Sequence, residues 1–331
     1  MAATDSAQPL SRVLEWKEVH ADLHVVKATF LLGYGQSEGL TTSGIAHRFL
    51  DMAKSNASAL QHGTVEDMEQ EAEGIKQLEE GLAKFAKHEG PEPQLELDTT
   101  MTLVRHEGKV AIFSPAAPGE ATFKRIDELG QVDALIAPNV QHWLFLQDYA
   151  KQYPSARVFL SDPALDEDLA SKVGGAGGVN AFQRLKSGEK QVFPTLAQQY
   201  LEGATQAMHE VLFLHEPSGT LITSDAFYPG YPSNVTVGWR PGWFARAWFK
   251  LTKAPHSFTD PTLPIYRTAR VASAGSPAAL LESLNWLQQN WDFSRIVSAH
   301  GFTPYQPENA NEAFRTAWMD GCDLQKLVGQ S

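Results

Sequence analysis

Three polar residues whose side chains can bind metal ions, His142, Asp225 and His300, stand where short apolar strands are predicted to end. The first of these strands, residues 134–137, is followed by Asn139 before His142 is reached. In open α/β sheets, ligands bind in the crevice beyond the carboxyl ends of the strands. One carboxylate and two imidazoles form an oxygen and nitrogen donor set that suits zinc or iron. This pattern indicates a candidate metal site at the strand ends.

Each of these residues also has an ordinary structural interpretation, and the sequence leaves both open. An Asp after a strand often forms a turn or caps a helix, which fits Asp225 equally well. His300 is followed by glycine and could mark a turn, and His142 could satisfy backbone groups at the start of a helix. His209 and His215 fall on one face of a single predicted strand, where hydrogen bonding in a partly buried setting is favoured over metal binding.

The elements that must position these residues follow from periodicity. Alternating apolar residues predict strands, and apolar residues at helical spacing predict helices. From the first hairpin onward, strands and helices alternate, which is typical of a sheet with crossover helices. The expected order is two strands within 14–34, a helical hairpin at 43–88, strands at 102–105 and 109–113, a helix at about 120–129, a strand at 133–137, a helix at 141–152, strands at 156–160, 209–215 and 219–224, a helix at 276–290 and a strand at 295–299.

The composition is that of an ordinary folded protein and disfavours several classes of partner. The chain has 331 residues, of which 43% are hydrophobic, and a net charge of −12. An acidic chain without a dense Lys/Arg stripe is a poor match for nucleic acid or anionic membranes. Cys322 is the only cysteine, so a disulfide framework and a Cys-rich zinc cluster are excluded. Because no secretory signal or membrane span is recognised, we expect a cytoplasmic protein.

Several segments resemble the metallo-β-lactamase-fold superfamily. Residues 219–225 resemble the strand that ends in that family's metal-bridging Asp, and residues 295–301 resemble the late strand that ends in a metal-binding His. Residues 133–139 lie where the family carries its principal ligand run, His-x-His-x-Asp-His. A closer resemblance is to a branch of the superfamily known as a domain of unknown function, and it covers roughly residues 14–40 and 98–305. The segments that carry this closer resemblance are 137–142, Tyr153-Pro154, 213–221 and Ala299-His300-Gly301.

The resemblance implies an α/β fold: a four-layer αβ/βα sandwich in which two sheets lie face to face with helices outside. We expect one domain spanning residues 1–331, with residues 43–90 as a helical insertion. The chain departs from the family in its ligand run, where Asn139 and two uncharged residues leave His142 as the one imidazole. The implied ligands are Asp225, His300 and His142, with His215 or His209 moving in. We therefore expect one zinc, iron or manganese ion, or no metal, rather than a two-metal site.

Two functional hypotheses follow from different classes. The first is a metal-dependent hydrolase of a small ester, lactone or thioester, with Asp225, His300 and His142 as catalytic residues. The second is a non-catalytic member of the fold that binds a small molecule or a protein, with the 43–88 hairpin as a contact surface and the chain as a monomer or homodimer. A serine hydrolase is disfavoured, because Ser218 lacks a Gly-x-Ser-x-Gly elbow. For the first hypothesis, the expected substrate-binding residues are Asn139, Trp143, Tyr228 and Trp243, the last within an aromatic segment at 239–249 that would shape an apolar pocket.

Overall fold

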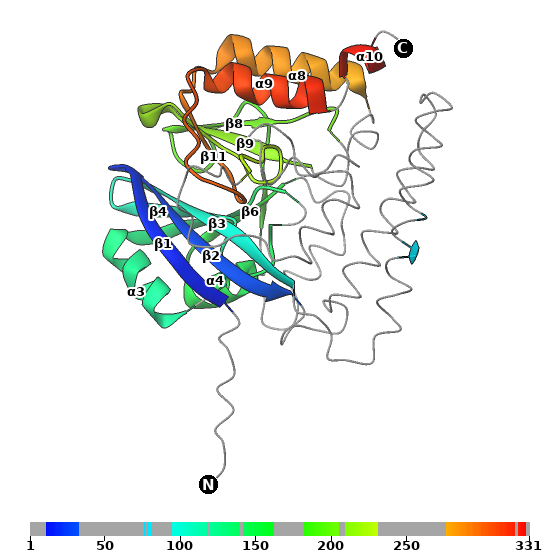
Figure 1. Ribbon diagram of the computed structural model, residues 1–331. Coiled ribbons are helices and arrows are strands. Elements are labelled where there is room, and N and C mark those ends of the chain that lie inside the picture. Colours follow the sequence, from blue (N-terminus) through cyan, green and yellow to red (C-terminus); the bar gives the residue numbers. More distant parts are fainter. Residues whose placement is uncertain are drawn as a thin grey trace.

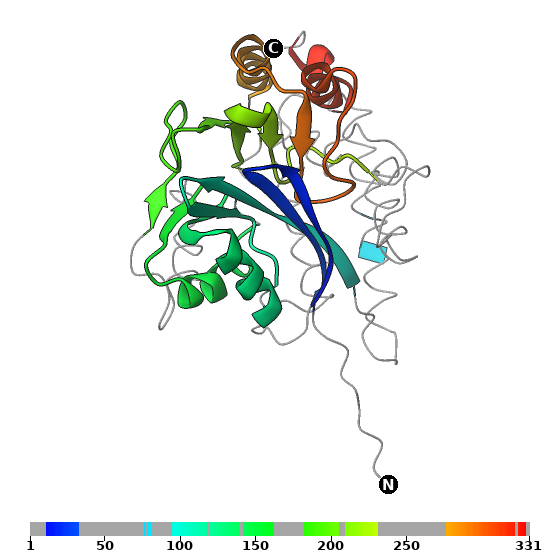
Figure 2. The ribbon, with the colours of Figure 1, turned by 90° about the vertical axis from the view of Figure 1, so that its left-hand side faces the viewer.

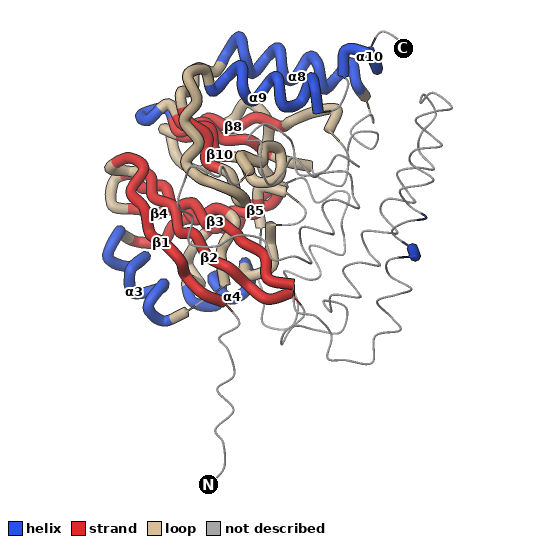
Figure 3. The backbone as a smooth tube through the Cα atoms, viewed as in Figure 1, coloured by secondary structure: helices blue, strands red, loops and turns tan. Residues whose placement is uncertain are grey.

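Two β-sheets lie face to face between outer layers of helices in the computed structural model (Figures 1 and 2). Figure 3 shows the strands in the middle, with helices outside one sheet and further helices outside the other. The structure describes residues 11–32, 76, 79–80, 95–117, 119–139, 142–161, 182–204, 209–230, 276–321 and 324–328. The observed architecture is thus the predicted α/β sandwich of four layers.

The first sheet has seven strands in spatial order identical to their chain order. Neighbours among its first four strands are antiparallel, whereas β4 to β7 run parallel. Two helices make the crossovers from β4 to β5 and from β5 to β6 and cover the outer face of the sheet. The elements are β1 (Ser11–His20), β2 (Leu23–Leu32), β3 (Leu95–His106), β4 (Lys109–Phe113), α3 (Glu120–Leu129), β5 (Gln131–Ala137), α4 (Leu146–Gln152), β6 (Arg157–Leu160) and β7 (Gln183–Arg184).

The second sheet has four strands in the order β11-β10-β9-β8, and only β10 and β11 are parallel. Helices α8 and α9 cover its outer face, with α10 beside them (Figure 1). None of the helices that the structure describes is long and apolar enough to cross a membrane. The elements are β8 (Leu196–Tyr200), β9 (Val211–His215), η2 (Glu216–Ser218), β10 (Thr220–Ile222), α8 (Pro277–Asn290), β11 (Arg295–Val297), α9 (Ala310–Gly321) and α10 (Leu324–Val328).

The central core lies between the two sheets and joins them. Phe113 of β4 and Phe213 of β9 meet edge to face with ring centroids 4.9 Å apart. Both rings are almost fully buried, as are Ile136 of β5 and Val297 of β11. Separate apolar clusters fill the space between each sheet and its helices. Strands β4, β5 and β6 are buried on both faces over most of their length, which is why their sequences are largely apolar, whereas the two residues of the edge strand β7 are exposed.

The sequence predicted most of these elements, but two predicted elements have different bounds and several observed elements were not predicted. The helix predicted at 141–152 begins at Leu146, because turns occupy residues 142–145. The strand predicted at 219–224 ends at Ile222, since the backbone amides of Ser224 and Asp225 donate to the side chain of Glu210 instead of to a neighbouring strand. Strands β7 and β8 and helices α9 and α10 were not predicted. The 239–249 segment lies outside the described residues, and of the 43–88 hairpin only Lys76, Glu79 and Glu80 are described, all helical.

Helix α8 begins at a side-chain cap that can be tested directly. Ser276 has extended backbone angles, and its Oγ accepts a hydrogen bond from the backbone N–H of Ala279 at 3.2 Å. Pro277 follows at the first helical position, where its missing N–H costs nothing. Ser276→Ala is expected to lower the free energy of unfolding by about 1 kcal/mol. Urea denaturation would measure the loss, and Ser276→Asp, which restores an acceptor, should recover most of it.

Candidate metal centre

The three residues singled out at the strand ends, His142, Asp225 and His300, come together in one group. The Nε2 atom of His142 lies 3.2 Å from Oδ2 of Asp225, and Nε2 of His300 lies 3.4 Å from Oδ1 of the same carboxylate. The two imidazole rings meet edge to face with centroids 5.1 Å apart. One potential ligand atom from each residue lies within 4.8 Å of the others. The side chain of Asp225 is 2% exposed and those of the two histidines are 10% and 18% exposed.

This group sits where the ends of strands from both sheets converge. Asp225 follows β10, His300 follows the parallel neighbour β11, and His142 follows β5 of the other sheet. Hydrogen bonds connect the two sheets at this edge and so fix the strand ends that carry the three side chains relative to one another. They join Val211 N to Pro138 O at 2.8 Å, Thr100 N to Ala299 O at 2.6 Å, and the hydroxyls of Ser114 and Ser224 at 3.0 Å.

Asn139 orients two members of the group through buried hydrogen bonds. Its side chain is fully buried, and its Nδ2 donates to Asp225 Oδ2 at 2.7 Å and to Glu210 Oε2 at 3.2 Å. Its Oδ1 accepts a hydrogen bond at 3.0 Å from the backbone N–H of His142, which fixes the turn that carries that imidazole. The sequence suggested Asn139 as a substrate-binding residue. The structure places it below the surface, where it orients two members of the group.

A second support fixes the orientation of His300. Its Nδ1 donates to the backbone carbonyl of Asp98 at 2.7 Å, so that Nε2 is the nitrogen facing Asp225. The Asp98 carboxylate accepts the backbone N–H of Gly301 at 3.0 Å and forms an ion pair with Lys27, which also donates to the carbonyl of Gly301. Metal-binding histidines commonly use their second nitrogen in this way. Asp98 and Lys27 were not predicted as part of the site, because each is one of several polar residues in its strand.

The charges in the group are strongly coupled. Burial alone would raise the pKa of Asp225, but the charges and hydrogen bonds of His142 and His300 outweigh it and hold that pKa far below its usual range. Burial alone would lower the pKa of His300, but the hydrogen bond and charge of Asp225 outweigh it and raise that pKa. Burial and the charge of Asp225 raise the pKa of Glu210, and hydrogen-bond donors around it oppose the shift.

The other two histidines considered as ligands lie outside this group. His215 is at the far end of β9 from Asp225, where its Nδ1 forms a 2.7 Å hydrogen bond with Ser218 Oγ. It is fully buried, and its ring lies 5.7 Å from that of His20. His209 Nδ1 forms a 2.9 Å hydrogen bond with the hydroxyl of Tyr200. Both histidines therefore have the hydrogen-bonding setting that the sequence favoured for them.

The residues suggested for substrate binding are dispersed. Tyr228 is 3% exposed, and its ring lies 6.4 Å from that of His300, beside the group. Trp143 is partly buried and packs against the apolar cluster on the helical face of the first sheet. Trp243 lies outside the residues that the structure describes.

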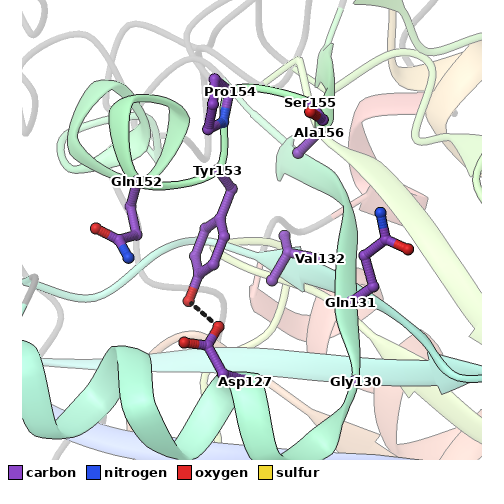
Figure 4. Close-up of a pocket in the computed structure, with 9 residues that line it drawn as sticks. All are labelled: Asp127, Gly130, Gln131, Val132, Gln152, Tyr153, Pro154, Ser155 and Ala156. Atoms are coloured by element: carbon purple, nitrogen blue, oxygen red, sulfur yellow. Dashed lines mark hydrogen bonds between the residues drawn. The ribbon is translucent and has the colours of Figure 1, made fainter.

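A cavity of about 490 Å³ opens at the amino end of β5, between the ends of α3 and α4 (Figure 4). Tyr153 points across it and donates a hydrogen bond to Asp127 at 3.1 Å. Burial and the nearby charge of Asp127 raise the pKa of this tyrosine. The cavity lies at the opposite end of β5 from Asn139 and is therefore separate from the metal-binding group.

The donor set fits a single divalent ion. Two ligand atoms bound to one tetrahedral zinc at about 2.0–2.1 Å lie roughly 3.3–3.4 Å apart. The Nε2 atoms of His142 and His300 lie 3.3 and 3.4 Å from the same oxygen, Oδ1 of Asp225, which matches this spacing. Three protein ligands leave a fourth position for water or substrate, as in catalytic zinc sites. Within the described part of the chain, this is the one group of three or more His, Cys, Asp or Glu residues whose ligand atoms lie within 4.8 Å of one another.

Solved structures share the architecture of this chain, whereas sequence comparisons find no match. No protein-family model and no curated protein sequence matches the chain. Among solved structures, the mono-zinc form of the metallo-β-lactamase FIM-1 from Pseudomonas aeruginosa aligns over 97% of this chain and 99% of its own, with 11% identity and a TM-score of 0.45. A fragment of diflavin flavoprotein A 5 from a Nostoc species aligns over the same shares of the two chains, with 11% identity and a TM-score of 0.50. The chain has the metallo-β-lactamase fold.

Proposed function

We propose that this protein is a metal-dependent hydrolase that works with one divalent ion held by His142, Asp225 and His300. The observation that carries the proposal is that two imidazole nitrogens lie 3.3 and 3.4 Å from one oxygen, Oδ1, of the buried Asp225 carboxylate. Small esters, lactones or thioesters are the proposed substrates, because a single ion with one open position suits attack of water on an activated carbonyl.

Each residue of the group has a distinct task in this proposal. When bound, the ion would polarise the substrate carbonyl and make water more acidic. His142 and His300 would supply neutral nitrogen donors, and Asp225 would supply the one negative charge. Asp98 holds the ring of His300 so that Nε2 faces inward, and Asn139 holds the carboxylate of Asp225. Tyr228, buried beside His300, would form one wall of the substrate site.

Metal content decides this proposal. Protein purified without a chelator and without a polyhistidine tag is expected to contain about one equivalent of zinc, iron or manganese, measured by plasma mass spectrometry. Zn²⁺ added to the metal-free protein at 100 times its Kd should stabilise the fold by about 2.7 kcal/mol, seen as a rise in Tm. Ester, lactone and thioester hydrolysis should then depend on the added ion. Protein that contains no metal and shows no change in Tm would contradict the proposal.

A non-catalytic binding protein is the second candidate function. The observation that favours it is Asn139, a buried amide that stands in the segment where the family carries its principal ligand run. A protein that binds one ion tightly yet hydrolyses none of the three substrate classes would support this second function. Metal content and hydrolysis therefore separate the two candidates.

A further inference from the structure

Glu210 is a fully buried carboxylate directly before β9, and the proposed mechanism gives it no task. Its environment is unusual because five hydrogen-bond donors surround its two oxygens inside the protein. Backbone amides of three consecutive residues, one hydroxyl and one side-chain amide point at its two oxygens. The donors are Thr223 Oγ1 and Ser224 N, both 2.6 Å from Oε1, and Asp225 N, Ala226 N and Asn139 Nδ2, at 2.8, 2.9 and 3.2 Å from Oε2.

The three backbone amides belong to the turn that carries Asp225. Strand β10 ends at Ile222, so the amides of residues 224–226 have no neighbouring strand to bond. A buried N–H group without a partner costs about 1–3 kcal/mol, and one carboxylate satisfies all three groups at once. The same carboxylate contacts Asn139, which in turn donates to Asp225. Glu210 thus restrains Asp225 through its backbone and, by way of Asn139, through its side chain.

We propose that Glu210 is a positioning residue that holds the 223–226 turn in the one conformation that directs the Asp225 carboxylate at His142 and His300. The proposal rests on the proposed metal site for its functional meaning, but its structural core concerns the turn alone. Outer partners that orient metal ligands typically contribute about 10–100-fold to metal affinity. Glu210 would exert its effect without touching the ion or the substrate.

Glu210→Gln, which replaces one carboxylate oxygen by an NH₂ group, is the most informative variant. In Glu210→Gln the new NH₂ group must face donors at one of the two oxygen positions, so at least one backbone N–H in the turn loses its acceptor. Thr223→Val is milder, because it removes a single donor and leaves the carboxylate in place. Gln198→Ala serves as the matched control. Gln198 is 1% exposed on β8 of the same sheet and bonds Lys186 O and Gln191, far from the 223–226 turn.

Two measurements on the full chain test the proposal. Hydrogen exchange followed by mass spectrometry should show that Glu210→Gln accelerates exchange at residues 224–226 at least 10-fold more than at β11, in metal-free protein. Titration with Co²⁺ should show an affinity about 10–100-fold weaker than wild type and an altered visible absorption spectrum. Thr223→Val should shift both readouts in the same direction by less. Gln198→Ala should lower the Tm and leave both unchanged.

The outcomes separate this inference from the proposed function. If wild-type protein binds Co²⁺ and both site variants match it in exchange and affinity, Glu210 has no positioning role and the metal site stands. If wild-type protein binds no Co²⁺, the metal site fails, and faster exchange at residues 224–226 in Glu210→Gln still supports restraint of the turn. Should Glu210→Gln fail to fold, Thr223→Val gives the decisive result, and unchanged exchange in that variant overturns the proposal.

Discussion

Asp225→Asn is expected to weaken Zn²⁺ binding by more than about 100-fold, a larger loss than the 10–100-fold typical of changes outside the ligand shell. Asp225 contributes the one carboxylate among the three ligands, and its oxygens lie within 3.4 Å of both imidazole nitrogens. An amide of the same shape keeps the packing but removes the negative charge that attracts the cation. Isothermal titration of metal-free protein would give the affinity, and the Zn²⁺-dependent rise in Tm should disappear.

The matched control is Asp133→Asn on β5. Asp133 is also a paired carboxylate, bonded to Lys109 at 3.1 Å and to Arg157. Burial would raise its pKa, but the hydrogen bonds and charges of these partners outweigh it and lower the pKa. Because Asp133 follows Val132 at the amino end of β5, its loss should reduce stability and leave Zn²⁺ affinity unchanged. Equal Zn²⁺ affinities for Asp225→Asn and wild type would remove Asp225 from the ligand set.

The strand-end residues could be predicted because local sequence fixed their positions. Asp225 and His300 each follow a short apolar run, and parallel pairing of those runs brings the two side chains to one edge. His142 was a candidate because it comes shortly after the strand predicted at 133–137, and this strand, β5, does bring it to the same edge. What the sequence lacked was the registration of the two sheets against each other, which the cross-sheet hydrogen bonds establish only in the folded chain.

The supporting residues could not be predicted because their partners are distant in sequence. Lys27 and Asp98 are separated by 71 positions in the sequence, and neither belongs to a recognisable motif. Glu210 fell within the strand predicted at 209–215, and its role had no sequence signal, because three of its donors are backbone groups. Asn139 was selected for its place in the ligand run, but its role depends on burial that only tertiary packing creates.

Strand β8 was not predicted because one of its buried residues is polar. Gln198 stands in the middle of the strand and is 1% exposed, yet its polarity breaks the alternation that predicts strands. Its side chain donates to the carbonyl of Lys186 and to Gln191, both in the segment before β8. The alternation of apolar residues predicts a strand only when its buried residues are apolar. A strand whose buried side chain is polar and hydrogen-bonded is therefore not predicted.

Acidification is expected to cost stability through His215, which lies away from the metal-binding group. Burial and the charge of His20 lower the pKa of His215 from 6.5 to about 4. The unfolded chain therefore takes up a proton on this residue more readily than the folded chain does. The stability contributed by the neutral ring is fully present above pH 6.5 and is lost as the pH falls toward 4. One pKa unit corresponds to about 1.4 kcal/mol, so the loss across this window is up to roughly 3 kcal/mol.

Urea denaturation of wild type and His215→Gln between pH 7.5 and pH 4.5 isolates this contribution, because all other titrating groups are common to both proteins. The stability of wild type relative to the variant should fall by about 2–3 kcal/mol over that range. Ser218→Ala is the control: it removes the 2.7 Å partner of Nδ1 but keeps the imidazole, so it should lower stability at every pH and retain the acid sensitivity. A constant difference between wild type and His215→Gln would mean that the folded protein accommodates the imidazolium, for example by turning the ring toward Glu216, whose charge already opposes the shift.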